Sequence, residues 1–400
     1  MNVMHRSISP TLPMAKPEEV GLSSARLAKL GEVMRREVEA KHVPGVTMLI
    51  SRRGKVAYRE NVGALRPGGP AMRSDAIFRV YSMTKPIVSV AIMMLVEEGR
   101  LFVSDPLAKF IPEFADPQVG VEKDGKLELV AAKRPITIQD LLRHTSGLTY
   151  GFTGASLVQR LYVEAPLRTQ DITSAGHVAA LAKLPLLNQP GTHWDYSHST
   201  DVLGRVVEII SGETLGAFLQ ARILAPLGMV DTGFFAPPEK HERLAEPFPE
   251  DPDTGAAVTL IETRVAPKFE SGGGGLVSTI EDYSRFTHML YHGGTLDGVR
   301  ILGRKMVAYM ASDHLGPHVA IGSDLLPPGH GFGLGFAVRR ENGMAPTPGT
   351  VGEFFWGGIA GTVFWVAPKE ELVALMLIQA PGQRDYYRQL FRNLVHAALT

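Results

Sequence analysis

The sequence predicts an α+β fold in which the two ends of the chain form one unit and a mainly helical segment is inserted between them. Strand-like and helical patterns occur together near both ends, whereas the middle is typical of helices joined by Pro- and Gly-rich connections. A cleft between two such units is a favoured place for a small-molecule site. The expected division is an N-terminal extension at 1–20, an α/β domain at 21–100 and 270–400, and a mainly helical domain at 101–269, with the functional site in the cleft between the domains.

The elements of the α/β domain are predicted from apolar spacing and from turn residues. Leu27, Leu30 and Val33 share one face of a helix expected at 24–40. Arg53-Gly54 is a hairpin turn between two expected strands. The other elements expected here are strands at 45–51 and 55–61, an extended segment at 76–80, a helix at 87–98, a helix from Ser278 or Thr279 to Gly293-Gly294, strands at 333–340, 353–356, 361–367 and 372–379, and a closing helix at 386–398.

The middle of the chain is expected to be mostly helical. Residues 137–140 form a Thr-x-x-Asp capping-box pattern, which begins a short helix that stops near Ser146-Gly147. A second helix is expected at 199–210, before Gly212, and a third at 214–224, before a Pro-Leu-Gly turn.

Composition excludes several classes of protein. The 400 residues include no cysteine, so disulfides, thiolate zinc sites, iron–sulfur clusters and a cysteine nucleophile are ruled out. Lys+Arg and Asp+Glu balance at 41 each, which gives no reason to expect nucleic acid or an anionic membrane as a partner. The longest apolar run, at about 86–96, is far shorter than the roughly 20 residues of a membrane span.

Ser82 and Lys85 are the first candidate catalytic residues. Residues three apart lie on the same helix face, so a helix beginning here places the Lys85 ammonium beside the Ser82 hydroxyl. Free N–H groups at the helix N-terminus suit a developing oxyanion. A Lys desolvated by so apolar a helix has a lowered pKa and can act as a base. The Ser-x-x-Lys spacing alone is close to chance, and a Ser helix cap with a snorkelling Lys explains it equally well.

Two further motifs carry candidate residues. Tyr196 follows the Pro190-Gly191 turn, and a Tyr beside a Lys loses its proton more readily and can relay protons; in isolation, a packing aromatic is the simpler explanation. Trp356 precedes the adjacent glycines Gly357 and Gly358, which let a ligand approach the backbone closely. An N–H there can complete an oxyanion hole, and a β-bulge or tight turn is the alternative.

Together the three motifs resemble those of serine β-lactamases and penicillin-binding proteins, which share Ser-x-x-Lys, a Tyr-x-x element and a Lys-Thr-Gly-like strand in this order. The sequence is most similar to the class C-like branch and, within it, to the family VIII carboxylesterases, where Trp-Gly-Gly often replaces Lys-Thr-Gly. The resemblance spans roughly residues 20–398 and includes the runs at 78–81, 141–148, 226–229 and 333–336. It implies a β-lactamase/transpeptidase-like fold, with an antiparallel sheet flanked by helices and a mainly helical domain.

Two positions depart from the β-lactamase pattern. His198 stands where β-lactamases have an Asn that holds a substrate amide, and Trp356 replaces a Lys that helps to fix the β-lactam carboxylate. Both changes favour a neutral acyl substrate. His198 is expected either to donate one hydrogen bond to the substrate in the Asn's place or to begin the next helix without a catalytic duty.

The resemblance implies a serine carboxylesterase that hydrolyses small, short-chain esters through an acyl-Ser82 intermediate. Lys85 and Tyr196 then act as one coupled proton-transfer unit, in which the base is not assigned because close pairs titrate jointly. The expected oxyanion donors are the N–H groups of Ser82 and Ile359, and the other expected substrate contacts are Trp356, Gly357, Gly358 and His198. A β-lactamase, a peptidase or amide hydrolase, an acyltransferase and a non-catalytic binding homologue are the alternatives.

No metal or cofactor is expected, because neither His-Glu-x-x-His nor a related zinc motif occurs, and the Gly-x-Ser-x-Gly elbow is also absent. His288 and His292 are four apart on a helix, but they lack a further obvious ligand and are expected to be surface or half-buried residues. The run at 271–275 lacks the end of a phosphate loop and is expected to be a flexible loop near the cleft. The expected partner is a small-molecule ester, with neither nucleic acid nor a membrane span involved.

The N-terminus has no apolar region typical of a secretory signal, so we expect a cytoplasmic enzyme of bacterial type. The sequence leaves the oligomeric state open.

Overall fold

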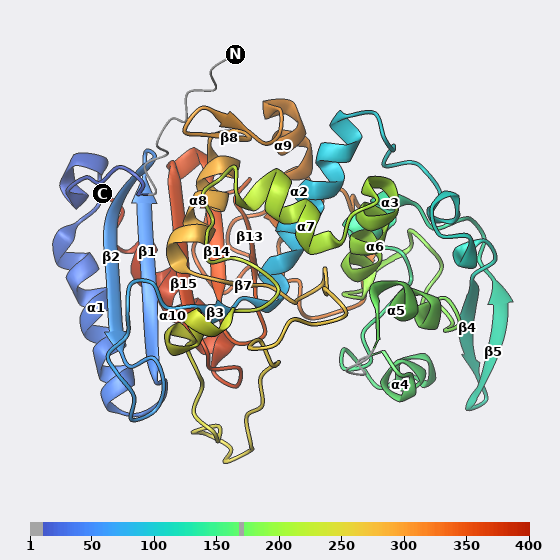
Figure 1. The fold of residues 1–400 in the computed structure, drawn as a ribbon, viewed down its shortest axis with the longest axis horizontal. Coiled ribbons are helices and arrows are strands. Elements are labelled where there is room, and N and C mark those ends of the chain that lie inside the picture. Colours follow the sequence, from blue (N-terminus) through green and yellow to red (C-terminus); the bar gives the residue numbers. More distant parts are fainter. Residues whose placement is uncertain (1–10, 168–171) are drawn as a thin grey trace.

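The computed structural model describes residues 11–167 and 172–400, and its central element is an antiparallel sheet of seven strands in the order β11-β12-β13-β14-β15-β1-β2 (Figure 1). Strands from the two ends of the chain meet where β1 pairs with β15. The turn between β1 and β2 has positive φ at both Arg53 and Gly54, as a two-residue hairpin requires. The strands are β1 (Gly45–Arg52), β2 (Lys55–Gly63), β11 (His330–Phe332), β12 (Ala337–Arg339), β13 (Phe354–Gly357), β14 (Val363–Ala367) and β15 (Leu372–Ile378).

Helices cover both faces of this sheet. α1 (Ser24–Glu39) and α10 (Arg384–His396) pack on one face, where Leu27, Leu30 and Phe391 join the inward side chains of the strands in one apolar cluster. α8 (Ile280–Tyr291) lies against β14, β15 and β1 on the other face. The sheet is therefore buried on both sides, which explains why the C-terminal strands are continuous apolar runs.

The mainly helical part of the chain lies beside the sheet, on the right of Figure 1. α2 (Thr84–Glu97) is buried on nearly every face and packs against α6 (Ser199–Ser211), so it connects the two parts. The remaining helices are η1 (Pro17–Val20), η2 (Tyr81–Met83), η3 (Leu107–Lys109), η4 (Pro112–Phe114), α3 (Ile138–Leu142), α4 (Leu157–Glu164), α5 (Ser174–Leu181), α7 (Leu215–Leu219), η5 (Gln220–Leu224), η6 (Pro238–Arg243), α9 (Arg304–Met310) and η7 (Pro368–Glu370).

Short strands complete the fold: β3 (Phe78–Arg79), β4 (Gln118–Lys123), β5 (Lys126–Ala131), β6 (His193–Trp194), β7 (Val277–Ser278), β8 (Thr295–Leu296), β9 (Val299–Arg300) and β10 (Ala320–Ile321). The β4–β5 hairpin was not predicted, because its side chains are mostly exposed and give little apolar alternation. Within the described ranges, no helix is long and apolar enough to cross a bilayer.

The predicted α+β class and most of the predicted elements are confirmed, and the capping box at Thr137 is present. The strand expected at 333–340 is shorter than predicted, since it begins at Ala337, and α2 begins three residues earlier than expected. Residues 1–10 of the predicted N-terminal extension lie outside the described residues. In the rest of that segment, the Ala15 N–H donates to the Val56 carbonyl of β2, 3.0 Å away.

Candidate active site

Ser82 lies at a strand-to-helix junction. β3 ends at Arg79, η2 spans Tyr81–Met83, and α2 follows directly. Tyr81 adopts a φ of 45°, in the left-handed region that non-glycine residues rarely occupy. Its phenol oxygen accepts a hydrogen bond from the Ile261 N–H at 2.9 Å, which fixes its ring. The sharp turn places the Ser82 side chain in the wall of a cavity.

The Lys85 ammonium lies behind Ser82, and its side chain is only 1% exposed. Its Nζ donates hydrogen bonds to Ser82 Oγ at 3.4 Å, to the Tyr150 hydroxyl at 3.2 Å and to the Gly273 carbonyl at 2.6 Å. The same Nζ lies 4.4 Å from the centre of the Tyr196 ring. The structure therefore brings together Ser82, Lys85 and Tyr196, whose proximity the sequence predicted.

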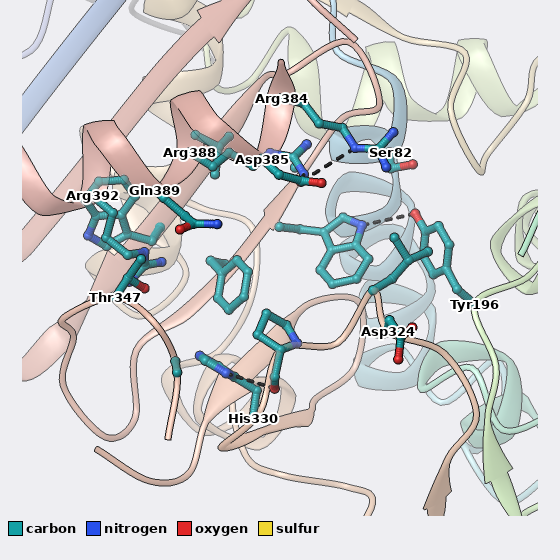
Figure 2. A pocket seen from close by; sticks show the side chains of 18 of the residues that line it. Ser82, Tyr196, Asp324, His330, Thr347, Arg384, Asp385, Arg388, Gln389 and Arg392 are labelled. Carbon is teal, nitrogen blue, oxygen red and sulfur yellow. Dashed lines mark hydrogen bonds and ion pairs between the residues drawn. The ribbon is translucent and has the colours of Figure 1, made fainter. Parts of the chain in front are cut away.

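Tyr196 and Trp356 are joined across the cleft. The Trp356 indole Nε1, on strand β13, donates a hydrogen bond to the Tyr196 hydroxyl at 3.1 Å (Figure 2). The two rings lie 5.2 Å apart, and the Tyr196 ring also packs on His144. These contacts fix the phenol oxygen in the cavity wall.

The turn after β13 carries the second expected oxyanion donor. Its close approach to the segment before Ser82 requires glycine, because a Cβ at Gly358 would lie 2.4 Å from the Val80 carbonyl oxygen. The Gly358 and Gly361 N–H groups are hydrogen-bonded within the turn, whereas the N–H of Ile359 has no acceptor among the described residues. Ile359 lines the same cavity as Ser82, so its N–H is available to a ligand.

The cavity has a volume of about 650 Å³ and extends from Ser82 to helix α10 (Figure 2). Three arginines of that helix, which the sequence analysis did not single out, form its far wall. Arg388 donates to the carbonyls of Gly358 and Thr362, and burial lowers the pKa of Arg388 to about 10. Arg392 is paired with Glu353. The third arginine of this wall is Arg384.

His198 does not line this cavity. It is the N-cap residue of α6, in agreement with the expectation that it begins the next helix. Its ring packs 4.3 Å from that of Tyr150, and its Nδ1 lies 3.3 Å from Asp201 Oδ2. The alternative expectation, a hydrogen bond from His198 to the substrate, has no support in this geometry.

Asp201 is a functional candidate that the sequence analysis did not name. The glycine loop at 271–275 was expected only as a flexible loop near the cleft. Asp201 Oδ1 accepts hydrogen bonds from Ser271 Oγ at 2.6 Å and from the Gly273 N–H at 2.9 Å. Burial alone raises the pKa of Asp201, but the hydrogen bond from His198 and nearby cationic groups outweigh it, and the net shift is downward. The loop lies beside Lys85, because the Asp201 carboxylate holds it in place and its Gly273 carbonyl accepts a hydrogen bond from the Lys85 ammonium.

His288 corrects the expectation of a surface or half-buried pair. It is fully buried, with Nδ1 2.7 Å from the Ser284 carbonyl and Nε2 2.7 Å from Ser51 Oγ. Burial lowers its pKa to about 4. His292 is exposed, so the two histidines have different environments.

Comparison with known proteins identifies the family. The sequence profile named Beta-lactamase matches residues 30–399. The chain belongs to the beta-lactamase family. Protein Rv1367c of Mycobacterium tuberculosis is 37% identical over 86% of this chain and 88% of its own length. Esterase EstB of Burkholderia gladioli is 32% identical over 90% of this chain and 92% of its own.

Among solved structures, EstCE1, a hydrolase with promiscuous acyltransferase activity, has a TM-score of 0.79 and 27% identity to this beta-lactamase family member. The match covers 93% of this chain and 99% of that one. The resemblance to the family VIII carboxylesterases and the β-lactamase-like fold are thereby confirmed, and the chain is a serine hydrolase of this superfamily.

Proposed function

We propose that this beta-lactamase family member is a serine carboxylesterase that cleaves small, short-chain esters through an acyl-Ser82 intermediate. The observation that carries the proposal is the buried Lys85 ammonium, 3.4 Å from the hydroxyl of a Ser82 that lines an open cavity. The name of Esterase EstB and the description of EstCE1 as a hydrolase support the same reaction class.

In this mechanism, Ser82 Oγ attacks the ester carbonyl carbon while its proton passes to the Lys85–Tyr196 unit. The carbonyl oxygen becomes an oxyanion that accepts hydrogen bonds from the N–H groups of Ser82 and Ile359, each worth about 3 kcal/mol in the transition state. The C–O bond to the alcohol then breaks, and the unit returns the proton to the departing alkoxide. Water attacks the acyl-Ser82 ester by the reverse proton path and releases the acid.

Trp356 favours an ester over a β-lactam as the substrate. Its indole bonds to Tyr196 and offers no cation to a lactam carboxylate there. The arginines that line the cavity are Arg384, Arg388 and Arg392 on α10 and Arg339 on β12. Arg388, Arg392 and Arg339 already form hydrogen bonds or ion pairs within the protein. A substrate panel tests this selectivity: short p-nitrophenyl esters, the same esters with a carboxylate on the acyl chain, and a chromogenic cephalosporin. We expect the highest kcat/KM for the neutral esters.

The nucleophile is tested by Ser82→Ala with Ser89→Ala as its matched control. Ser89 lies on α2, the helix that directly follows the η2 turn carrying Ser82. It is buried, and its Oγ has no hydrogen-bond partner among the described residues, so its loss removes no contact of the site. We expect Ser82→Ala to lose at least about a thousandfold in kcat and Ser89→Ala to keep wild-type activity. Intact-mass spectrometry after a fluorophosphonate probe should show an adduct on wild type and Ser89→Ala only. Wild-type ester hydrolysis by Ser82→Ala contradicts the proposal, and a wild-type protein without adduct or activity favours a non-catalytic binder.

Acyl transfer is the second candidate, because the EstCE1 description includes it. An acceptor alcohol would attack the same acyl-Ser82 in place of water. Product analysis with added short alcohols distinguishes the two reactions: a new ester indicates transfer, and free acid alone indicates hydrolysis.

A further inference from the structure

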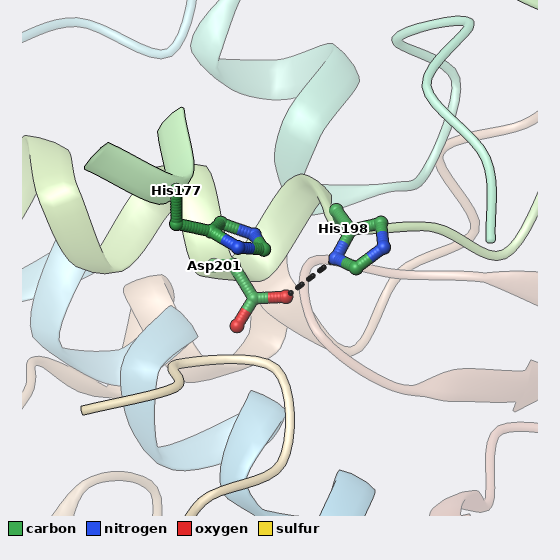
Figure 3. Close-up of side chains that lie close together, drawn as sticks. All are labelled: His177, His198 and Asp201. Carbon is green, nitrogen blue, oxygen red and sulfur yellow. Dashed lines mark hydrogen bonds and ion pairs between the residues drawn. The ribbon is translucent and has the colours of Figure 1, made fainter. Parts of the chain in front are cut away.

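A second cluster of chemically active side chains lies behind the catalytic centre, where His177, His198 and Asp201 converge (Figure 3). His177 lies on α5, while His198 and Asp201 begin α6. The three residues are 1%, 5% and 3% exposed, and one ligand atom from each lies within 4.8 Å of those of the other two. We propose that they bind a transition-metal ion, with Zn²⁺ the best match to the donor set.

His177 already has the arrangement of a metal ligand. Its Nδ1 lies 2.9 Å from the Leu167 carbonyl oxygen and must donate to it, which leaves a lone pair on Nε2. Most metal-binding histidines are oriented in this way, by a hydrogen bond from the ring nitrogen that does not bind the metal. Among the described residues, Nε2 has no hydrogen-bond partner, although an unsatisfied buried polar atom costs about 1–3 kcal/mol. A metal ion removes that cost.

The Asp201–His198 pair provides the other two ligands. Asp201 Oδ1 is occupied by Ser271 and Gly273, whereas Oδ2 faces His198 Nδ1 at 3.3 Å. Two ligands bound to a tetrahedral zinc at about 2.0–2.1 Å are separated by about 3.3 Å, so this pair already has the required spacing. The ligand atoms of the cluster lie within 4.8 Å of one another. The two that are farthest apart must therefore approach each other by at most about 1.5 Å to reach the tetrahedral spacing of about 3.3 Å. Two neutral imidazoles and one carboxylate, with a water molecule as the fourth ligand, form a set that zinc accepts.

The metal has a structural role in this proposal. None of the three ligands lines the cavity that contains Ser82, so the ion does not touch the substrate. It acts through Asp201, which holds the Gly273 N–H, while the carbonyl of Gly273 accepts from Lys85. Binding of the ion therefore stabilises the loop that positions Lys85.

The experiment uses the full-length protein, stripped with a chelator and free of any affinity tag. Calorimetric titration with Zn²⁺ should show one ion per chain, and a higher Tm should accompany binding. We expect His177→Ala to bind at least about tenfold more weakly. His396→Ala is the matched control, because His396 also has Nδ1 bonded to a backbone carbonyl and an unpartnered Nε2, but belongs to no metal-ligating cluster in the described chain. Its zinc affinity should equal that of wild type.

A wild-type measurement makes the test independent of whether a variant folds. X-ray absorption of the zinc-loaded protein should show two imidazoles and one carboxylate at the ion. The proposal is overturned if the stripped wild type binds no stoichiometric zinc, if the absorption spectrum lacks two imidazoles, or if His177→Ala binds as tightly as His396→Ala. Each of these results indicates a hydrogen-bonded His–Asp cluster instead. None depends on esterase activity, so the outcome is separate from that for Ser82.

Discussion

Replacing Gly273 with Ala is expected to reduce ester hydrolysis without touching the nucleophile. A Cβ at this position would lie 2.5 Å from Asp201 Oδ2 and 2.9 Å from the Tyr150 hydroxyl, both closer than real Cβ contacts. Either the Asp201 and Tyr150 side chains or the Gly273 backbone must therefore shift, and we expect the backbone to move because both side chains are buried; the 2.6 Å hydrogen bond from Lys85 Nζ to the Gly273 carbonyl then lengthens or breaks. A hydrogen bond from a charged donor contributes about 1.5–3 kcal/mol. At tenfold per about 1.4 kcal/mol, its loss lowers kcat/KM by roughly 10- to 150-fold.

Gly274→Ala provides the matched control in the same loop. The nearest atom to a Cβ at Gly274 is the Tyr81 carbonyl carbon at 3.7 Å, an ordinary contact, so this variant should stay within about twofold of wild type. Steady-state kinetics with a short p-nitrophenyl ester measures both variants, and circular dichroism establishes that each is folded. Equal kcat/KM for the two folded variants would refute the inference that the Gly273 carbonyl positions Lys85.

Three further outcomes follow from the structure. Trp356→Phe removes the hydrogen bond to Tyr196 and should lower kcat by roughly 2- to 10-fold in the same ester assay, as expected for about 0.5–1.5 kcal/mol. Glu353→Gln leaves the buried Arg339 guanidinium without its counter-charge and should cost about 3–5 kcal/mol of unfolding free energy in a urea titration. Burial raises the pKa of Asp282 to about 6, above the value near 3.9 for an unfolded chain. The folded state therefore binds the extra proton between these values, and this group's contribution to stability falls as the pH rises from about 4 to 6. Asp282→Asn should remove that part of the pH dependence of unfolding, and an unchanged profile would contradict the assignment.

Sequence patterns predicted that Ser82, Lys85 and Tyr196 lie together, because the information for this is local or comes from the resemblance. The three-residue spacing places Ser82 and Lys85 on the same side of the continuous helical turn formed by η2 and the start of α2, and the distance of 3.4 Å between Lys85 Nζ and Ser82 Oγ agrees with it. Tyr196 and Trp356 were singled out from the order of the motifs along the chain, and in the structure a hydrogen bond connects them. The positive φ of Arg53 and Gly54 likewise follows from turn chemistry within two residues.

The partners of these residues were not predictable in the same way. Lys85 is bonded to Tyr150, 65 positions away, and to Gly273, 188 positions away. Helical and strand periodicity describes which face of one element is apolar, and it carries no information on which distant residue meets that face. The direction of the His198 side chain was not predictable for this reason, because the sequence places it at a helix start but does not show that it lies beside Asp201 and Tyr150 and outside the lining of the cavity.

By itself, the sequence determined the α+β class and most of the elements, and it proposed the reacting groups, since these depend on apolar period, capping residues and motif order. The tertiary structure alone decided how the reacting groups are held: the Gly273 carbonyl at Lys85, the arginine wall of the cavity, and the meeting of His177 with Asp201. The physical reason is that burial and close packing bring together groups far apart in the chain. In the packed interior, charged groups are removed from water, and hydrogen bonds form between residues that are distant in the sequence.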